Sequence, residues 1–200
     1  MAGEGSVRLS LLSDSMLYAI VALVALLHQP VTQGKAITPF AGPWFAWTEK
    51  FSVCEGQYPW SWNIKTTPYN PQKHELQLIS GNVTGDKTID DNFWLKVVMD
   101  LRSKNQWSNK GLTFEFKNKA CTAVVSNIPG FYSLFFGKEK KPCSIDPGVY
   151  RVDQEPIDWN FPNFPIVPYG HYKFRIMSGI GNDMAVCLIN EVHLIPKPTT

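Results

Sequence analysis

The sequence lacks the motifs by which many enzymes and nucleic-acid-binding proteins are recognised. Its 200 residues contain no nucleophile-elbow, zinc-protease or phosphate-loop motif. Charged residues make up only 18%, the net charge is +2, and the densest basic run, at residues 138–141, includes a glutamate. Such a run falls short of a nucleic-acid footprint. We therefore expect a non-enzymatic protein with no nucleic-acid partner.

Histidine and acidic pairs are also scarce. Only His74, His171 and His193 follow the N-terminal segment, and none shares a motif with Asp, Glu or Ser. Asp90 and Asp91 are adjacent, but neighbouring strand residues point to opposite faces, which makes them a poor acid–base pair. We assign no catalytic residue, no metal ligand and no cofactor.

Cysteine occurs four times, at Cys54, Cys121, Cys143 and Cys187, and never as C-x-x-C. This absence argues against zinc-finger and thioredoxin-type chemistry. In an oxidising compartment an even number of cysteines predicts two disulfides, each worth about 3–5 kcal/mol on the chain-entropy account. The spacing leaves all three pairings open.

No apolar run is long enough to span a bilayer, which takes about 20 residues. The longest, at residues 16–27, has the length of a signal-peptide core, and small residues follow at Gly34 and Ala36. We predict a signal peptide at 1–36, cleaved after Ala36 or Gly34, and a single domain at 37–200. A glycosylation sequon at Asn82, expected in a glycine-flanked turn, agrees with a secreted, extracellular or endosomal–lysosomal location.

Hydrophobic residues (44%) and aromatic residues (13%) are plentiful, so a folded core can form. Apolar and polar residues alternate as in strands. About seven or eight such strands predict an all-β, antiparallel sandwich. In one of them Leu76 and Leu78 are expected to share a face opposite Gln77. The other clear alternating runs fall at residues 92–101, 112–117, 172–176 and 186–194.

Two segments break this alternation. Residues 128–137 read IPGFYSLFFG, and Pro129 and Gly137 predict the start and end of a short helix near 129–136. Residues 157–168 read IDWNFPNFPIVP, where three prolines forbid a regular helix or central strand. The first segment is either buried or turns its aromatic side chains to a ligand or a membrane. The second is either an edge strand packed under the sandwich or the rim of a cavity.

The order of features from Cys121 onward resembles the ML lipid-recognition family. Cys143 is followed by SIDPGVY, then by the proline-rich segment, then by YGHYKF at residues 169–174. The match is best over about residues 112–178 and lies nearest the ganglioside-activator-like branch; CheB-type secreted chemosensory proteins are also similar. This chain departs from the ganglioside activator in having fewer cysteines.

That resemblance implies an immunoglobulin-like sandwich with an internal hydrophobic cavity between its two sheets. It also implies the pairs Cys54–Cys187 and Cys121–Cys143. The bound lipid's head would lie near residues 138–141 or the proline-rich loop. We expect the cavity wall at Val97, Met99, Phe114, Phe116, Tyr172, Phe174 and Ile176, and its lip at Phe131, Leu134, Phe135, Phe136, Trp159, Phe161 and Phe164.

The leading hypothesis is therefore a secreted protein that holds a lipid or other hydrophobic small molecule for transport, presentation or chemosensing. Its expected contacts are transient ones with a membrane surface and with a receptor or enzyme. The alternatives are a closed-core interaction protein, for which the same side chains form an ordinary core, and a hydrolase with dispersed residues that include His171.

Overall fold

The computed structural model describes residues 40–73, 75–108 and 111–197. The chain divides into two units, Met1–Lys35 and Ala36–Thr200, and every described residue belongs to the second. The predicted signal peptide at 1–36 and His74 lie outside the described residues. No helix within the described ranges is long and apolar enough to cross a membrane.

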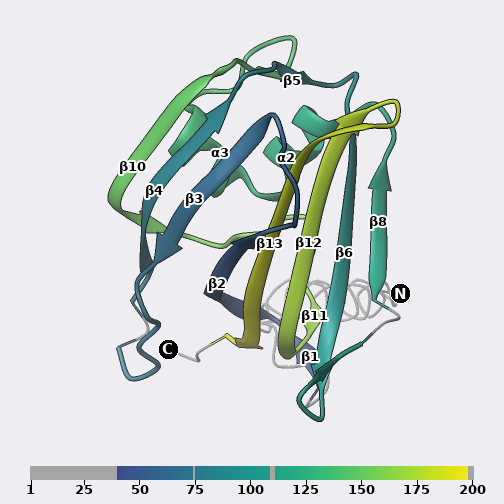
Figure 1. The fold of residues 1–200 in the computed structure, drawn as a ribbon. Helices are drawn as coiled ribbons and strands as arrows, with labels where there is room; N and C mark the ends of the chain where they lie inside the picture. Colours follow the sequence, from purple (N-terminus) through teal and green to yellow (C-terminus); the bar gives the residue numbers. More distant parts are fainter. Residues whose placement is uncertain (1–39, 74, 109–110, 198–200) are drawn as a thin grey trace, which may run out of the picture. The chain divides into compact units, whose positions relative to one another are not determined.

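Two antiparallel sheets dominate this unit (Figure 1). The larger has six strands in the order β2-β13-β12-β6-β7, with β8 also paired to β6. The smaller has three strands in the order β10-β4-β3. The strands of the larger sheet are β2 (Trp44–Val53), β6 (Trp94–Ser103), β7 (Gln106–Trp107), β8 (Leu112–Phe116), β12 (Gly170–Ile180) and β13 (Asp183–Pro196). Those of the smaller sheet are β3 (Trp60–Thr66), β4 (Gln77–Gly85) and β10 (Gly148–Ile157).

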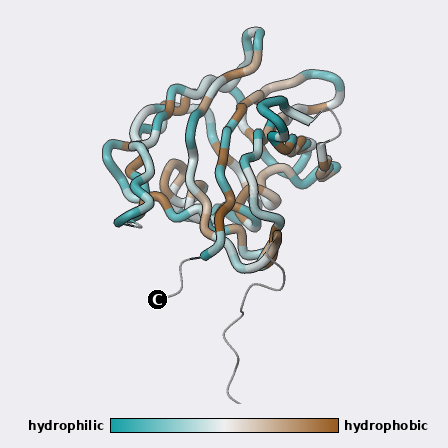
Figure 2. Tube along the Cα trace, turned by 90° about the horizontal axis from the view of Figure 1, so that it is seen from below, coloured by the Kyte–Doolittle hydropathy of each residue, from teal (hydrophilic) through white to brown (hydrophobic). Residues whose placement is uncertain are grey.

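Two short ribbons complete the strand set: β1 (Ala41–Gly42) pairs with β11 (Val167–Pro168), and β5 (Ile89–Asp90) pairs with β9 (Ser144–Ile145). Hydrophobic and hydrophilic residues alternate along much of the trace (Figure 2). The expected all-β, antiparallel sandwich is confirmed, because the two sheets pack against each other through β2, β13 and β3.

Two helices lie between β8 and β9 in the chain: α2 (Ala120–Asn127) and α3 (Pro129–Phe136). The short helix expected near 129–136 is confirmed as α3, with Pro129 at its start. Helix α2 is not anticipated by the sequence pattern. It has no capping side chain of its own; instead the Asp91 carboxylate accepts hydrogen bonds from the Thr122 backbone N–H (2.8 Å) and hydroxyl (2.5 Å). A carboxylate at a helix N-terminus is favourable.

Aromatic contacts join α3 to the smaller sheet. The Phe136 ring lies 6.2 Å from Trp60 and 4.9 Å from Tyr150, and the Phe131 ring lies 6.2 Å from Trp62. Phe131 and Phe135 are buried. The apolar character of α3 on all sides is therefore explained by burial between elements.

Both disulfides implied by the resemblance are present. Cys54–Cys187 joins the end of β2 to β13, and Cys121–Cys143 ties α2 to the segment before β9. Every cysteine is thus in a disulfide, which leaves no thiol for catalysis or metal binding.

One expectation for β4 is wrong. Asn82 lies within β4, the central strand of the smaller sheet, and not in a turn. Gln77 is buried and Leu76 is 44% exposed, so the inward face is the one that carries Gln77. That face also carries the fully buried Ile79 and Val83. The Gln77 amide is satisfied there, because it accepts from Thr48 N and donates to Thr48 O and Thr67 O at 2.7–2.8 Å.

Candidate functional site

A cavity of about 320 Å³ lies against the inner face of the six-stranded sheet. Alternation directs one row of side chains from each strand toward it. Rows from β6, β8, β12 and β13 contribute, together with Phe51 of β2. The strand residues that line it are Phe51, Leu95, Val97, Met99, Leu112, Phe114, Phe116, Tyr172, Phe174, Ile176, Leu188, Asn190, Val192 and Leu194.

The opposite wall is made by the helices and the proline-rich segment. Helix α2 and the residue after it contribute Ala123, Val124, Asn127 and Ile128, and α3 contributes Phe131. The segment between β10 and β12 contributes Trp159, Phe161, Phe164, Ile166, Val167 and Pro168. The three prolines keep most of this segment out of regular pairing, so its aromatic side chains can turn inward.

The position of the cavity differs from the one expected. Among the described residues, none from β3, β4 or β10 lines it, so the smaller sheet does not form its second wall. Helix α3 occupies that place: its Phe136 packs on Trp60 and Tyr150 of the smaller sheet, while its Phe131 faces the cavity beside Trp159, with ring centroids 6.0 Å apart.

The cavity reaches solvent where its lining residues are exposed. Leu112 at the start of β8 is 60% exposed and Ile166 in the proline-rich segment is 47% exposed. Phe114 of β8 and Phe164 of the proline-rich segment meet edge to face, with ring centroids 5.7 Å apart. The mouth therefore lies between β8 and the proline-rich segment, whereas residues 138–141 are not among the lining residues.

A few polar groups interrupt this apolar lining. Asn190 donates from Nδ2 to Thr48 Oγ1 at 3.3 Å, but its buried Oδ1 has no hydrogen-bond partner among the described residues. The buried Nε1 of Trp159 is likewise unpartnered within the part of the chain described. Tyr172 is satisfied through its hydroxyl, which donates to Pro168 O at 3.0 Å, and burial raises its pKa. An unpaired buried acceptor or donor is costly.

Eleven of the fourteen residues predicted from sequence line this cavity: Val97, Met99, Phe114, Phe116, Phe131, Trp159, Phe161, Phe164, Tyr172, Phe174 and Ile176. Leu134, Phe135 and Phe136 do not. Phe135 and Phe136 contact each other, and Phe136 also packs on the smaller sheet.

Asn82, the predicted glycosylation site, is half-buried, and its side chain donates to Thr84 Oγ1 at 3.4 Å.

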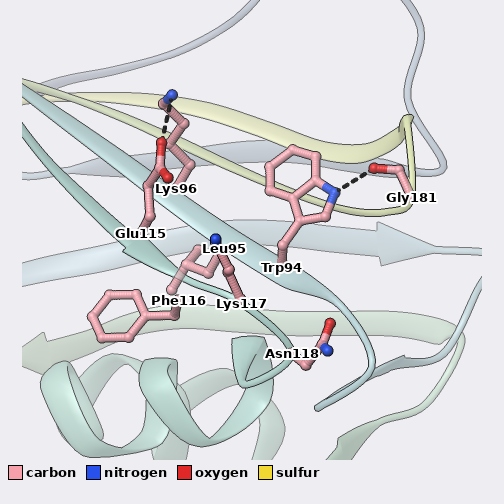
Figure 3. A pocket seen from close by; sticks show the side chains of 8 residues that line it. All are labelled: Trp94, Leu95, Lys96, Glu115, Phe116, Lys117, Asn118 and Gly181. Carbon is pink, nitrogen blue, oxygen red and sulfur yellow. Dashed lines mark hydrogen bonds and ion pairs between the residues drawn. The ribbon is translucent and has the colours of Figure 1, made fainter.

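A second hollow, of about 490 Å³, lies where β6 and β8 meet the β12–β13 turn (Figure 3). Two of its polar side chains are already paired: Trp94 Nε1 donates to Gly181 O at 3.0 Å, and Lys96 pairs with Glu115 at 2.8 Å. Leu95 and Phe116 are shared with the first cavity. We favour the smaller cavity as the functional site because its lining is far more apolar.

Sequence reasoning missed Asn190, the α2 residues and a cluster of Glu49, His171 and His193 on the outer face of the larger sheet. The histidines face each other across the β12–β13 hairpin, but a register shift at Ser178/Gly179 sets that pairing, and the sequence does not show the shift. Nothing in the sequence around Glu49 indicates that it joins them.

Searches with the sequence give no direct assignment: no protein-family profile matches the chain, and no curated protein is significantly similar to it.

Proposed function

We propose that this protein is a secreted, non-enzymatic carrier or presenter that holds a hydrophobic small molecule, such as a single acyl chain, in the cavity beneath the six-stranded sheet. The observation that carries the proposal is the cavity itself. Its volume of about 320 Å³ falls within the range of about 300–1,000 Å³ common for small-molecule sites. The two disulfides are compatible with an oxidising, extracellular location.

The chemistry of the lining supports an apolar ligand. The walls consist mainly of aliphatic and aromatic side chains from strands, helices and loop. Each CH₂ group buried against such a wall contributes about 0.8 kcal/mol, so affinity needs few polar contacts. A volume near the lower end of the usual range favours one acyl chain or a compact hydrophobic molecule over a lipid with several chains.

The ligand's polar group belongs at the mouth. The mouth between Leu112 and Ile166 leaves a head group in water, as the resemblance to the ML family would require. Asn190 Oδ1 and Trp159 Nε1 have no partner among the described residues, but both atoms are fully buried and present no surface to the cavity. The closed-core interaction protein is the weaker proposal, because a closed core would leave no such volume.

The test compares two substitutions on one strand. Val97 lines the cavity, whereas its neighbour Val98 lies on the other face of β6 and is absent from the lining. A V97W variant fills the cavity, while V98W adds the same bulk outside it. Displacement of a fluorescent fatty acid should be saturable in the wild type and in V98W. In V97W the fatty acid should bind at least about tenfold more weakly, a loss of about 1.4 kcal/mol, because the indole occupies its space.

Lipid mass spectrometry of the purified protein identifies the natural ligand. A co-purifying lipid that is depleted in V97W and retained in V98W supports the proposal. No bound lipid together with no saturable displacement in the wild type would overturn it.

A further inference from the structure

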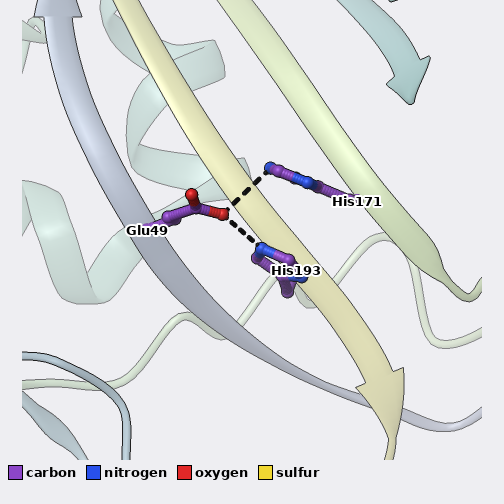
Figure 4. A group of neighbouring side chains, drawn as sticks. All are labelled: Glu49, His171 and His193. Atoms are coloured by element: carbon purple, nitrogen blue, oxygen red, sulfur yellow. Dashed lines mark hydrogen bonds and ion pairs between the residues drawn. The ribbon is translucent and has the colours of Figure 1, made fainter. Parts of the chain in front are cut away.

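Three metal-ligating side chains from neighbouring strands converge on the outer face of the six-stranded sheet (Figure 4). Glu49 lies on β2, His193 on β13 and His171 on β12. Glu49 Oε2 is 2.6 Å from His193 Nε2 and 3.3 Å from His171 Nε2. One ligand atom from each residue lies within 4.8 Å of the others. The cavity lies on the opposite face of the sheet, so this cluster takes no part in ligand binding there.

A β-bulge brings Glu49 to this position. Lys50 pairs with Glu191 of β13, and Thr48 pairs with Val192, which leaves Glu49 as the extra residue of β2. A bulge re-aims a side chain at the cost of a ladder position. Here the bulged residue is the one whose carboxylate reaches both histidines.

The two imidazole rings are held in place by their neighbours. His171 and His193 are directly opposite in the β12–β13 register and stack with centroids 3.9 Å apart. Trp47 also stacks on His193, at 4.0 Å, and Trp107 meets His171 edge-on at 5.0 Å. Packing in this way keeps both rings beside Glu49, although a shared ion requires one of them to tilt.

The His171 ring has an unused atom. Its buried Nε2 has no hydrogen-bond partner among the described residues, although two carboxylates lie nearby. Burial, with help from His193, lowers the pKa of His171, while the hydrogen bond with His193 lowers the pKa of Glu49. Metals bind histidine as the neutral imidazole and glutamate as the carboxylate.

We propose that Glu49, His171 and His193 form a binding site for a divalent transition-metal ion, with Zn²⁺ as the best match. Two imidazoles and one carboxylate suit Zn²⁺ and disfavour Mg²⁺ and Ca²⁺, which prefer oxygen ligands. Ligand atoms about 2.1 Å from a tetrahedral ion lie about 3.4 Å apart, so the side chains need to shift only modestly, with one ring tilting out of the stack. Glu191, whose Oε2 is 3.8 Å from His171 Nε2, is the nearest candidate for a further oxygen ligand.

Two cations oppose metal binding at this face. Arg102 Nη1 lies 3.4 Å from His171 Nδ1, where it favours the tautomer that protonates Nε2. Lys173 sits over Trp107 at 4.7 Å but is balanced by Asp100 at 4.0 Å. The exposed Arg102 side chain can turn away from His171. Replacing Arg102 by a neutral residue should therefore strengthen metal binding.

A bound ion would join three adjacent strands of the sheet that forms the cavity wall. Metal binding should therefore raise the melting temperature of the folded protein, since the unfolded chain does not hold the three ligands together.

The experiment uses the full disulfide-bonded chain, purified without a histidine tag and treated with chelator. Isothermal titration with Zn²⁺ should give one saturable site per chain, and Co²⁺ should produce a visible absorption spectrum. H171A and H193A should each weaken Zn²⁺ binding by more than about 100-fold, since loss of a mere supporting residue already costs about 10–100-fold. R102Q should tighten it.

The matched control is E115Q, which removes an exposed carboxylate on β8 and should leave Zn²⁺ binding unchanged, whereas E49Q weakens it. Mg²⁺ and Ca²⁺ should give no signal. The absence of saturable Zn²⁺ binding, or binding that survives in an H171A/H193A double variant with a native circular dichroism spectrum, would overturn the proposal. Neither result depends on the lipid cavity.

Discussion

At the scale of single residues, Gln77 of β4 links the two sheets through hydrogen bonds to Thr48 of β2. Its side-chain amide is the hydrogen-bond partner of three backbone groups: Thr48 N–H, Thr48 C=O and Thr67 C=O. Replacing it with Ala leaves buried N–H and C=O groups unpaired, at about 1–3 kcal/mol each. We expect Q77A to lower the free energy of unfolding by about 2–3 kcal/mol in urea titrations. E75A, at a neighbouring exposed position, should change it by less than about 0.5 kcal/mol; equal midpoints for the two variants would contradict this role.

The same residue marks a limit of sequence reasoning. Alternation is visible in the sequence up to Ser80 and puts Leu76 and Leu78 on one face, but the buried face is the opposite one, which continues from Gln77 through Ile79 and Val83. Gly81 and Gly85 resemble turn signals, yet both lie inside β4. A Cβ on Gly85 would come within 2.2 Å of the Trp60 indole, and one on Gly81 within 2.1 Å of Asn63 O. Those glycines permit close approach between strands, a need that becomes visible only once the strands are paired.

At the scale of elements, strands with unbroken alternation are the predictable ones. The inward rows of β6, β8 and β12 are placed correctly from sequence, and they supply much of the cavity wall. Strand β2 escapes prediction because its bulge at Glu49 shifts the period between Thr48 and Lys50. Helix α2 escapes it because its capping carboxylate, Asp91, comes from a distant segment.

The disulfide Cys121–Cys143 provides a test of how the helices form the cavity wall. It closes a loop that contains α3 and most of α2, with a sequence separation of 22 residues. On the chain-entropy account its removal costs about 3 kcal/mol, against about 5 kcal/mol for Cys54–Cys187 with its separation of 133. We expect C121A/C143A to lower the melting temperature less than C54A/C187A does.

Ligand affinity should follow the opposite order. The shorter loop carries Ala123, Val124 and Phe131 of the cavity wall, whereas β2 and β13 remain hydrogen-bonded to each other without Cys54–Cys187. Displacement of a fluorescent fatty acid, measured below the melting temperature of each variant, should therefore weaken in C121A/C143A. Wild-type affinity in that variant would show that the helices hold their place without the disulfide.

At the scale of the whole molecule, the sequence indicates which side chains gather but not which layers enclose them. Most of the predicted residues do line one cavity, yet α3 packs on the smaller sheet and confines the cavity to the side of the larger one. Periodicity assigns a residue to a face of its own strand. It carries no information about which distant element covers that face, because that depends on the path of the loops that bring distant segments back to the sheet.

Because the cavity wall combines both helices, five strands of the larger sheet and the proline-rich segment, a bound ligand should stabilise the folded unit as a whole. A ligand at 100 times its Kd stabilises the folded state by about 2.7 kcal/mol, and about 1 kcal/mol raises the melting temperature of a domain of this size by about 2–4 °C. Scanning calorimetry with saturating fatty acid should therefore show one transition shifted upward by about 5–10 °C. The shift should persist in V98W and disappear in V97W, in which the guest has no room. A shift that is equal in both variants would mean that the ligand binds elsewhere on the surface, since of these two residues only Val97 contributes to the lining.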